Sequence, residues 1–429
     1  MRGLYTATVL DALSQHFASR RNAAQLDVGR GFDLVTGTST GGIIACGLAF
    51  GLSTAELIHL FRTVGPLVFK NPMPNRALAF ASWALRHLHR SANSDENLRA
   101  ALAEQFGHAT LQGVFRERGV AVCVPSVNLS TCQSIVFKTP HQQHFTRDGR
   151  LELVDVCLST SAAPIYLPLA AIKHPDDEAQ DMILTDGGLW ANNPVLVGLI
   201  EGLSLAGSDR PIEILSVSTC PSAQGTLTKR RDRSWGLFRW RAGTTALTMS
   251  LESQSWGYYH MALKLAEVLR GLGRQCRVIR LPHSAPSIQQ SVHLGLDRAS
   301  PEAMTVLADL GRNDGDFDRI LATLGATEAS IVADVFGDMP LIGEGHLKAS
   351  TTRRRAERIP KNILIDDRLQ MTDESEDGAA FITNTAPVRG TQMSYTLDGK
   401  RVFGTVRWVH PIATGKFGFG IEKLHRPQA

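Results

Sequence analysis

A strand, a glycine-rich turn and a helix follow one another near the start of the chain, and this unit constrains the fold most. Residues 32–36 are a short apolar run, residues 37–42 read Gly-Thr-Ser-Thr-Gly-Gly, and residues 43–52 are a helical run. Such a unit is typical of α/β folds. Further strands are expected at 120–125, 134–138, 182–185 and 212–218, and helices at 4–16, 54–64, 95–107, 151–160 and 194–206. The alternation predicts a mainly parallel sheet covered by helices on both faces.

The pattern changes towards the end of the chain. Long helices are expected at 245–271 and 301–323, with a strand at 275–281 between them. Residues 336–345 contain three glycines and a proline, which indicates a linker. Beyond it the apolar period becomes two, and strands are expected at 362–365, 379–383, 393–397, 401–409 and 417–422, the third and fourth flanking Asp-Gly at 398–399. We therefore expect an α/β domain at 1–335, a linker at 336–349 and a small all-β barrel module at 350–429.

Composition and charge exclude several classes of protein. The 429 residues are 43% hydrophobic and carry a net charge of +4, all of it in residues 341–429, with 14 Lys and Arg against 10 Asp and Glu. A protein that coats a nucleic-acid polymer would carry more basic charge, spread more widely. No apolar run reaches the roughly 18 residues of a membrane span, and the start does not read as a secretory signal. Six cysteines without C-x-x-C pairs predict reduced thiols, so we expect a cytoplasmic protein.

Ser39 lies in the glycine-rich turn and is the candidate nucleophile. The turn fits G-x-S-x-G, with Gly37 and Gly41 on either side of the serine. Glycines let the backbone pass close by, and the following helix points its first N–H groups at a developing oxyanion. Structural turns and phosphate-binding turns share this composition, so the motif alone is weak. No lysine follows the glycines, which disfavours a nucleotide P-loop.

Asp186 is the candidate partner of Ser39. It ends an apolar strand at Asp-Gly-Gly, and a helix follows. Because α/β folds place ligands at the carboxyl ends of strands, we expect its carboxylate to lie near the serine. The alternative is an ordinary Asp-Gly turn.

A Ser-His-Asp triad is the competing arrangement. Among the later histidines His260, His283 and His293, His283 alone follows an expected strand, and we interpret it as a core or surface residue. A Ser-Asp dyad is simpler, because Asp186 can take the proton from Ser39 without an imidazole.

These segments together resemble the patatin-like phospholipases, in particular their bacterial members, over roughly residues 1–325. The matching segments are residues 37–42, 159–164, 186–194 and 214–219. The resemblance implies a three-layer α/β/α fold, an acyl-enzyme on Ser39 and hydrolysis of lipid acyl esters without a cofactor or metal. It also implies a lipid substrate, which we expect to be a membrane phospholipid.

The oxyanion loop of that family is matched only in part. Family members carry D-G-G-G-x-R-G after their first strand, whereas this sequence begins Met-Arg-Gly-Leu, so Arg2 and Gly3 are what remains of the loop. We expect the first strand and most of the loop to be absent, either because the start is placed late or because half of the oxyanion hole is lost. The expected donors are Arg2, Gly3 and Thr40. Because one donor is worth about 10²–10³ in rate, weak activity is expected.

Residues 229–241 mix cations with aromatic side chains. Arg230, Arg231, Trp235 and Trp240 are candidates for contact with an anionic bilayer surface, where tryptophan rings lie among the headgroups. The alternative is a solvated loop whose aromatic rings pack back on the core. The membrane reading predicts peripheral contact with the inner face of the membrane.

The last module carries two short motifs. Arg354 and Arg358 fit R-x-x-x-R, and Asp373, Ser375 and Gly378 fit D-x-S-x-x-G. Together they resemble the motifs of PilZ domains, which implies cyclic di-GMP as a regulatory ligand. Each motif alone is common in solvated linkers and turns, and the spacing between the two is short.

Three functions remain open at this point. The leading one is a serine lipid acyl hydrolase, of phospholipase A type, attached to a nucleotide-sensing module. The second is a catalytically weak or inactive signalling scaffold, which the incomplete oxyanion loop favours. The third is an acyltransferase, because an acyl-enzyme can pass its acyl group to an alcohol other than water. The sequence leaves the oligomeric state open.

Overall fold

The chain divides into two compact units, Met1–Ala349 and Ser350–Ala429, in the computed structural model. Up to residue 342 the structure describes every residue except 75, 208–209, 221–232, 237–238 and 241–242. Beyond residue 342 it describes the strands of the second unit.

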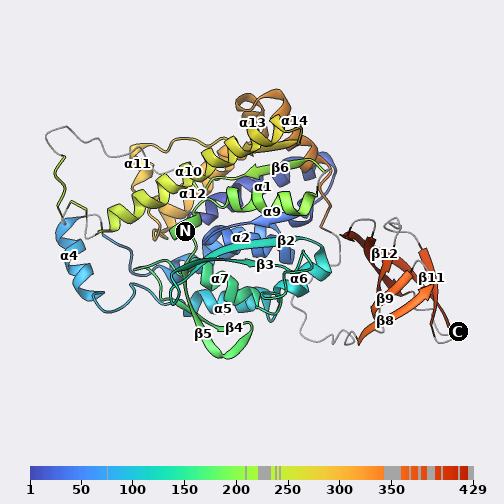
Figure 1. Cartoon of the computed structure of the whole chain (residues 1–429). Helices are drawn as coiled ribbons and strands as arrows, with labels where there is room; N and C mark the ends of the chain where they lie inside the picture. The colour runs from blue at the N-terminus through green and yellow to red at the C-terminus, as the bar shows by residue number, and fades with distance from the viewer. Residues whose placement is uncertain are drawn as a thin grey trace. The chain divides into compact units, whose positions relative to one another are not determined.

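The first unit is built from alternating helices and short strands (Figure 1). In chain order they are α1 Gly3–Arg20, β1 Leu34–Thr36, α2 Thr40–Phe50, α3 Thr54–Val68, α4 Ala77–Arg86, α5 Glu96–Phe106, α6 Leu111–Arg118, β2 Ala121–Asn128, β3 Gln133–Lys138, α7 Leu153–Ser161, β4 Ala170–His174, β5 Asp177–Asp186, α8 Gly188–Ala191, α9 Val195–Ala206, β6 Ile212–Ser216, α10 Thr244–Gly271, β7 Cys276–Arg280, α11 Ile288–Ser291, α12 Pro301–Asp314, α13 Phe317–Thr323 and α14 Ala326–Gly337. The predicted alternation of strands and helices is confirmed. The single helix expected over 301–323 is instead two, because the Asp316 side chain caps a new helix by accepting from the Arg319 N–H.

The main sheet is mixed, so the expectation of a mainly parallel sheet is wrong. β1 runs parallel to β2, whereas β3, β4 and β5 each pair antiparallel with a neighbour. The physical reason is local: β2 and β3 form one hairpin and β4 and β5 another, and a hairpin returns antiparallel. The strands β6 and β7 form a separate parallel pair.

Two strands share one edge of β2. β3 pairs with residues 123–128 of β2, which occupies the opposite edge along that length. β1 pairs with residues 121–123 and β5 with residues 126–128. Because β1 is parallel to β2 and β5 antiparallel, their carboxyl ends face each other over Val124 and Pro125.

Helices cover both faces of this sheet (Figure 1). On one face, a Cβ added to Gly42 of α2 would lie 3.1 Å from Val124 of β2 and 2.6 Å from Thr160 of α7. The preceding residue of β2, Cys123, points to the other face and lies near Glu201 of α9. The three layers are therefore α2 and α7, the sheet, and α9.

The first unit continues past α14. The Asp27 N–H donates to the Pro340 carbonyl at 2.6 Å, and Leu341 pairs with Leu26 in an isolated bridge. Phe336 and Met339 are buried. The linker expected at 336–349 therefore begins too early, because apolar side chains inside the glycine-rich run pack on the core.

The second unit contains one six-stranded antiparallel sheet. Its strands are β8 Ile359–Asp366, β9 Leu369–Glu374, β10 Gly378–Thr383, β11 Gln392–Leu397, β12 Lys400–Ala413 and β13 Lys416–Lys423. They are arranged in the order β11-β12-β13-β10-β9-β8. Leu397 lies opposite Lys400, so the predicted two-residue hairpin is confirmed. β9 was not expected from the sequence.

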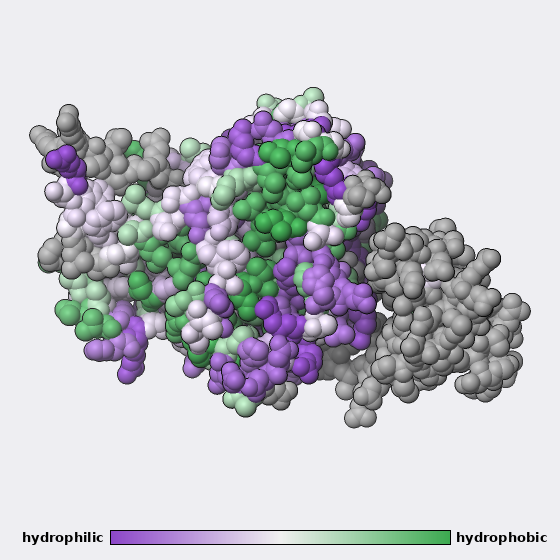
Figure 2. All heavy atoms as spheres, viewed as in Figure 1, coloured by the Kyte–Doolittle hydropathy of each residue, from purple (hydrophilic) through white to green (hydrophobic). Residues whose placement is uncertain are grey.

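The surface of the first unit is apolar in places. Figure 2 shows hydrophobic side chains gathered over the region of β6 and α9. Exposed apolar residues on the neighbouring helices include Ile200 of α9 and Val268 of α10. No helix within the described ranges is both long and apolar enough to cross a bilayer.

The helix α9 offers a matched test of packing on the sheet. A Cβ at Gly198 would lie 2.8 Å from the Thr36 methyl of β1, whereas one at Gly202 would meet Ile212 at 3.7 Å. We expect Gly198→Ala to lower the free energy of unfolding by about 1–2 kcal/mol, because a stiff β-branched residue must shift. Gly202→Ala should raise it by about 0.5–1 kcal/mol through helix propensity. Urea unfolding measures both, and equal effects would contradict this packing.

Candidate functional site

Ser39 lies in a strained turn between β1 and α2. Its backbone has φ 57° and ψ −126°, which costs a serine about 1–3 kcal/mol. A Cβ at Gly37 would come within 1.9 Å of the Gly41 carbonyl oxygen, so residue 37 must be glycine. A Cβ at Gly41 would meet nothing within 4 Å, so this glycine leaves open space beside the serine. The turn thus holds Ser39 in one conformation and keeps its approach clear.

Ser39 and Asp186 meet directly. The Ser39 hydroxyl donates to Oδ2 of Asp186 at 2.6 Å, and Oδ1 of Asp186 accepts from the Gly188 N–H at 2.7 Å. Asp186 is buried, and burial raises its pKa from 3.8 to about 6, although these two hydrogen bonds act in the opposite direction. A carboxylate with this pKa is ionised at neutral pH and can still accept a proton.

The end of α7 fixes both partners. The Ser39 N–H donates to the Thr160 hydroxyl at 3.0 Å, and that hydroxyl donates to the Pro125 carbonyl at 2.6 Å. The Asp186 N–H donates to the Ala162 carbonyl at 3.0 Å. The sequence of residues 159–164 indicates the family resemblance but does not predict this positioning role, because hydroxyls on a helix carry no signal of what they bind.

Two helix N-termini lie beside the serine. In α2 the Gly41 and Gly42 N–H groups donate to the Thr38 and Ser39 carbonyls, which leaves the Thr40 N–H as the group not used within this turn. A Cβ at Gly3 would lie 2.8 Å from the Thr40 Cβ, so the start of α1 packs against the start of α2.

The Arg2 side chain points elsewhere. Its Nε donates to the Leu294 carbonyl at 3.2 Å, and a second nitrogen pairs with Glu252 at 3.2 Å. Its guanidinium is therefore engaged away from Ser39, and any role of Arg2 in the oxyanion hole falls to its backbone.

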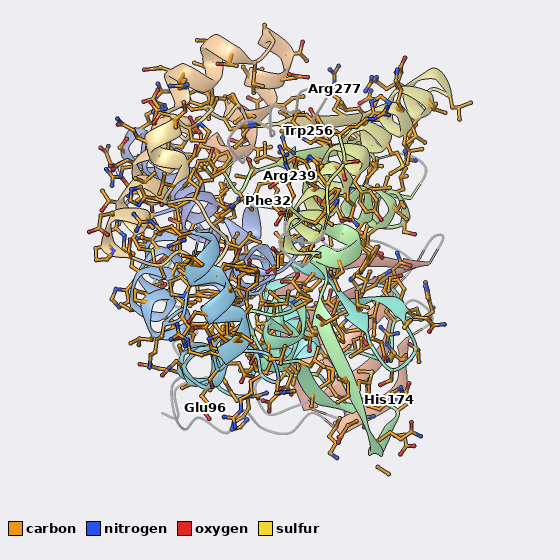
Figure 3. The ribbon with its side chains drawn as sticks, turned by 90° about the vertical axis from the view of Figure 1, so that its left-hand side faces the viewer. Phe32, Glu96, His174, Arg239, Trp256 and Arg277 are labelled. Carbon is orange, nitrogen blue, oxygen red and sulfur yellow. The ribbon has the colours of Figure 1, made fainter. Side chains whose placement is uncertain are left out.

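A cavity of about 600 Å³ opens from Ser39 and Asp186. Its walls are largely apolar and come from α3 on one side and α10 on the other, with Leu60, Phe61, Val64, Leu247 and Leu251 among the lining residues. Figure 3 labels Phe32 and Trp256, which both line it and lie in the upper half of that view. An acyl chain fits such a space.

His283 takes no part in the contact between Ser39 and Asp186. Among the described residues the recorded partners of the Asp186 carboxylate are the Ser39 hydroxyl and the Gly188 N–H. His283 follows β7, is half-buried and lines the cavity.

The remaining predicted site residues lie only partly within the described residues. Trp235 and Trp240 pack edge to face with centroids 5.1 Å apart, and Arg239 stacks 5.0 Å over the Trp235 ring. Arg230 and Arg231 lie outside the described residues.

The candidate residues of the second unit also lie only partly within the described residues. Arg354, Arg358 and Ser375 lie outside the described residues. Asp373 is in β9 and Gly378 begins β10, so the D-x-S-x-x-G motif spans the connection between two paired antiparallel strands.

One group of side chains in the described part of the chain has metal-ligand chemistry. The ligand atoms of Cys123, His141 and Glu201 lie within 4.8 Å of one another. However, Glu201 already pairs with Lys138 at 2.5 Å and His141 at 2.9 Å, and the other ring nitrogen of His141 bonds to Thr139 at 2.7 Å. The ammonium of Lys138 supplies the positive charge, so we assign this cluster to the structure of the core. All six cysteines are free, and all except Cys132 are buried.

The pKa of Asp186 makes stability depend on pH. Because burial raises the folded-state pKa, the protonated form favours folding below pH 3.8, and this contribution is lost as the pH rises through about 6. Relative to Asp186→Asn, the wild type should lose up to roughly 3 kcal/mol of stability between pH 4 and pH 8. Urea unfolding of both proteins at these pH values measures this loss. If the difference in unfolding free energy between the two proteins does not change with pH, the pKa of the Asp186 carboxyl is not shifted.

Comparisons with known proteins agree with this geometry. The family model described as patatin-like phospholipase matches residues 1–199. A protein of Vibrio cholerae serotype O1 named cGAMP-activated phospholipase is 31% identical over 343 residues, covering 78% of this chain and 91% of its own length. Proteins with the same name from Pseudomonas aeruginosa (34% identical; 73% of this chain, 84% of theirs) and Escherichia coli (35%; 51% and 59%) are also similar. The chain therefore belongs to the patatin-like phospholipase family and is a hydrolase of lipid carboxylic esters.

Proposed function

We propose that this phospholipase works through a dyad in which Ser39 is the nucleophile and Asp186 the general base. The observation that carries the proposal is the 2.6 Å hydrogen bond from the Ser39 hydroxyl to Asp186, made by a serine in a strained turn at the end of an open cavity. Strain and burial both cost stability, and such costs concentrate where chemistry requires them.

The reaction follows from the contact. The proton of the Ser39 hydroxyl moves to Oδ2 of Asp186 while Oγ attacks the acyl carbonyl carbon, which forms a tetrahedral oxyanion. Collapse of this intermediate breaks the ester bond, and Asp186 returns the proton to the leaving alcohol. Water then attacks the acyl-enzyme with Asp186 again as base, which releases the fatty acid and regenerates Ser39.

Backbone N–H groups are the proposed oxyanion donors. The Ser39 N–H already donates to Thr160, so the Thr40 N–H at the start of α2 is the nearest group of the turn that remains. The N-terminus of α1, at Gly3, lies beside Thr40 and adds its partial positive charge. Two neighbouring helix N-termini stabilise a developing negative charge without reorganisation.

The acyl chain of the substrate is proposed to lie along the apolar walls of α3 and α10. Contact with a bilayer through the segment around Trp235 and Trp240 is part of the same proposal, because paired tryptophan rings with a stacked arginine suit the headgroup region. Product release as free fatty acid, and not as a new ester, separates hydrolysis from acyl transfer.

Regulation by a cyclic dinucleotide is also proposed. The relatives carry cGAMP activation in their names, and the second unit places its D-x-S-x-x-G motif between paired strands of an antiparallel sheet. We propose that this unit is a PilZ-like barrel that binds cyclic di-GMP, with Arg354 and Arg358 on the phosphates.

Substitution of the nucleophile tests the catalytic proposal. Ser39→Ala should abolish labelling by a fluorophosphonate probe and lower fatty-acid release from phosphatidylglycerol vesicles by roughly 10⁴-fold or more, because no other group can form the acyl-enzyme. Ser130→Ala, an exposed serine in a turn, is the matched control and should change neither. Labelling that survives in Ser39→Ala would place the nucleophile elsewhere.

Two dinucleotides test the regulatory proposal on the full chain. We expect cyclic di-GMP to raise fatty-acid release about tenfold or more, and the double variant Arg354→Ala/Arg358→Ala to lose this response while basal hydrolysis continues. The assay is repeated with cGAMP. A response to cGAMP alone, unchanged in the double variant, would contradict the assignment to the second unit.

A further inference from the structure

The parallel strands β6 and β7 end at a second polar part of the cavity. Ser216 and Arg280 are paired at their carboxyl ends, and the Leu281 N–H donates to the Ser216 carbonyl at 3.0 Å. The residues that follow these ends, among them Ser218 and His283, line the same cavity as Ser39 and Asp186. The carboxyl edge of parallel strands is where α/β folds place ligands.

Arg280 is half-buried and has no ionic partner in the described part of the chain. Its Nε is buried without a hydrogen-bond partner, and its guanidinium lies 5.1 Å from the centroid of the Tyr259 ring. Burial lowers the pKa of this arginine from its ordinary value, which is the direction expected for a cation without a counter-charge. An uncompensated buried cation is costly, so its retention needs an explanation.

The carboxylates of this region are committed to other groups. Asp314 accepts from the Tyr5 hydroxyl at 2.7 Å and from the Ser284 N–H at 2.9 Å. Glu252, which lines the cavity, pairs with Arg2 at 3.2 Å. Neither is recorded as an ion-pair partner of Arg280 among the described residues, so its charge remains available to a ligand.

His283 adds a second unused group. Its Nδ1 is buried and makes no hydrogen bond with any described residue, and His283 lines the same cavity as Arg280. A guanidinium and an imidazole that both lack partners, at one strand edge and in one cavity, form a site for an anion with several oxygen acceptors.

We propose that Arg280 and His283 bind a phosphodiester in the cavity. A guanidinium offers parallel N–H groups that match two phosphate oxygens, and the guanidinium of Arg280 lies over the Tyr259 ring. The proposal rests on the proposed function of Ser39, because it places a phosphate within the same cavity as the scissile ester. The phosphodiester comes either from the headgroup of the substrate or from a cyclic dinucleotide, and in the second case this cavity replaces the dinucleotide site proposed in the second unit.

The test compares two esters in wild type, Arg280→Gln, Arg280→Lys and the matched control Arg277→Gln. Arg277 lies on the same strand but is exposed, and Figure 3 shows it near the upper edge of that view. Fatty-acid release from phosphatidylglycerol vesicles is measured against hydrolysis of the neutral ester p-nitrophenyl butyrate. Binding of cGAMP to each protein is measured by calorimetry.

A headgroup site predicts that Arg280→Gln lowers the ratio of phospholipid to neutral-ester hydrolysis about tenfold or more. The ratio for Arg280→Lys should lie between those of wild type and Arg280→Gln, and Arg277→Gln should leave the ratio unchanged. A nucleotide site predicts the same ratio as wild type but a loss of cGAMP binding of about tenfold or more in Arg280→Gln. If neither the ratio nor cGAMP binding changes, the proposal is overturned.

Stability separates a ligand site from a structural role. Because an unpaired buried cation destabilises the free protein, Arg280→Gln should melt at the same temperature as wild type or higher. A melting temperature lowered by more than about 5 °C would assign Arg280 to the core instead. His283→Gln, which removes the imidazole alone, gives a second variant with the same expected direction in the ratio or in cGAMP binding. Failure of wild type to hydrolyse either ester would instead contradict the proposed function of Ser39.

Discussion

Two strands that run in opposite directions end against the same stretch of β2. β1 arrives parallel and β5 antiparallel, on the same edge, and Val124 and Pro125 separate their last paired residues. Everything at the site depends on this arrangement, because the turn after β1 carries Ser39 and the last residue of β5 is Asp186. The two side chains meet although 147 positions separate them in sequence. The backbone ladder therefore brings the two strand ends together, and the turn after β1, held by Thr160, places Ser39 against Asp186.

Contacts with α7 and β2 stabilise the site of Ser39 and Asp186 on one side, and its other side opens into the cavity. Thr160 at the end of α7 binds both the Ser39 N–H and the Pro125 carbonyl, so one hydroxyl joins the turn to β2. Gly187 follows Asp186, and a Cβ there would lie 2.1 Å from the Pro125 carbonyl oxygen, so glycine is needed for the chain to cross the sheet. The strained φ of Ser39 and the buried carboxyl both cost stability, and the packed layers of α2, α7 and α9 offset that cost.

The sequence could predict those parts of the fold and site that local patterns determine. The strand, the glycine-rich turn and the helix around Ser39 are contiguous, and Asp186 ends an apolar run before two glycines, so each signal lies within ten residues. The direction of β5 could not be predicted in this way, because it depends on the hairpin with β4, whose short, partly polar strand carries a weak signal. The positions of Thr160 and Arg280 depend on tertiary contacts. A hydroxyl on a helix or an arginine on a strand has the same local pattern whether it faces solvent or a cavity.

The central claim is that Asp186, held against Ser39, is the base of the reaction, and the pH dependence of acylation tests it most directly. The rate at which a fluorophosphonate labels Ser39 should rise with pH, with a midpoint near the pKa of about 6 that burial gives Asp186, and stay level up to pH 8. The same profile should be lost in Asp186→Asn, together with most of the rate. A rate that is unchanged between pH 5 and pH 8, or a profile that survives in Asp186→Asn, would contradict the account.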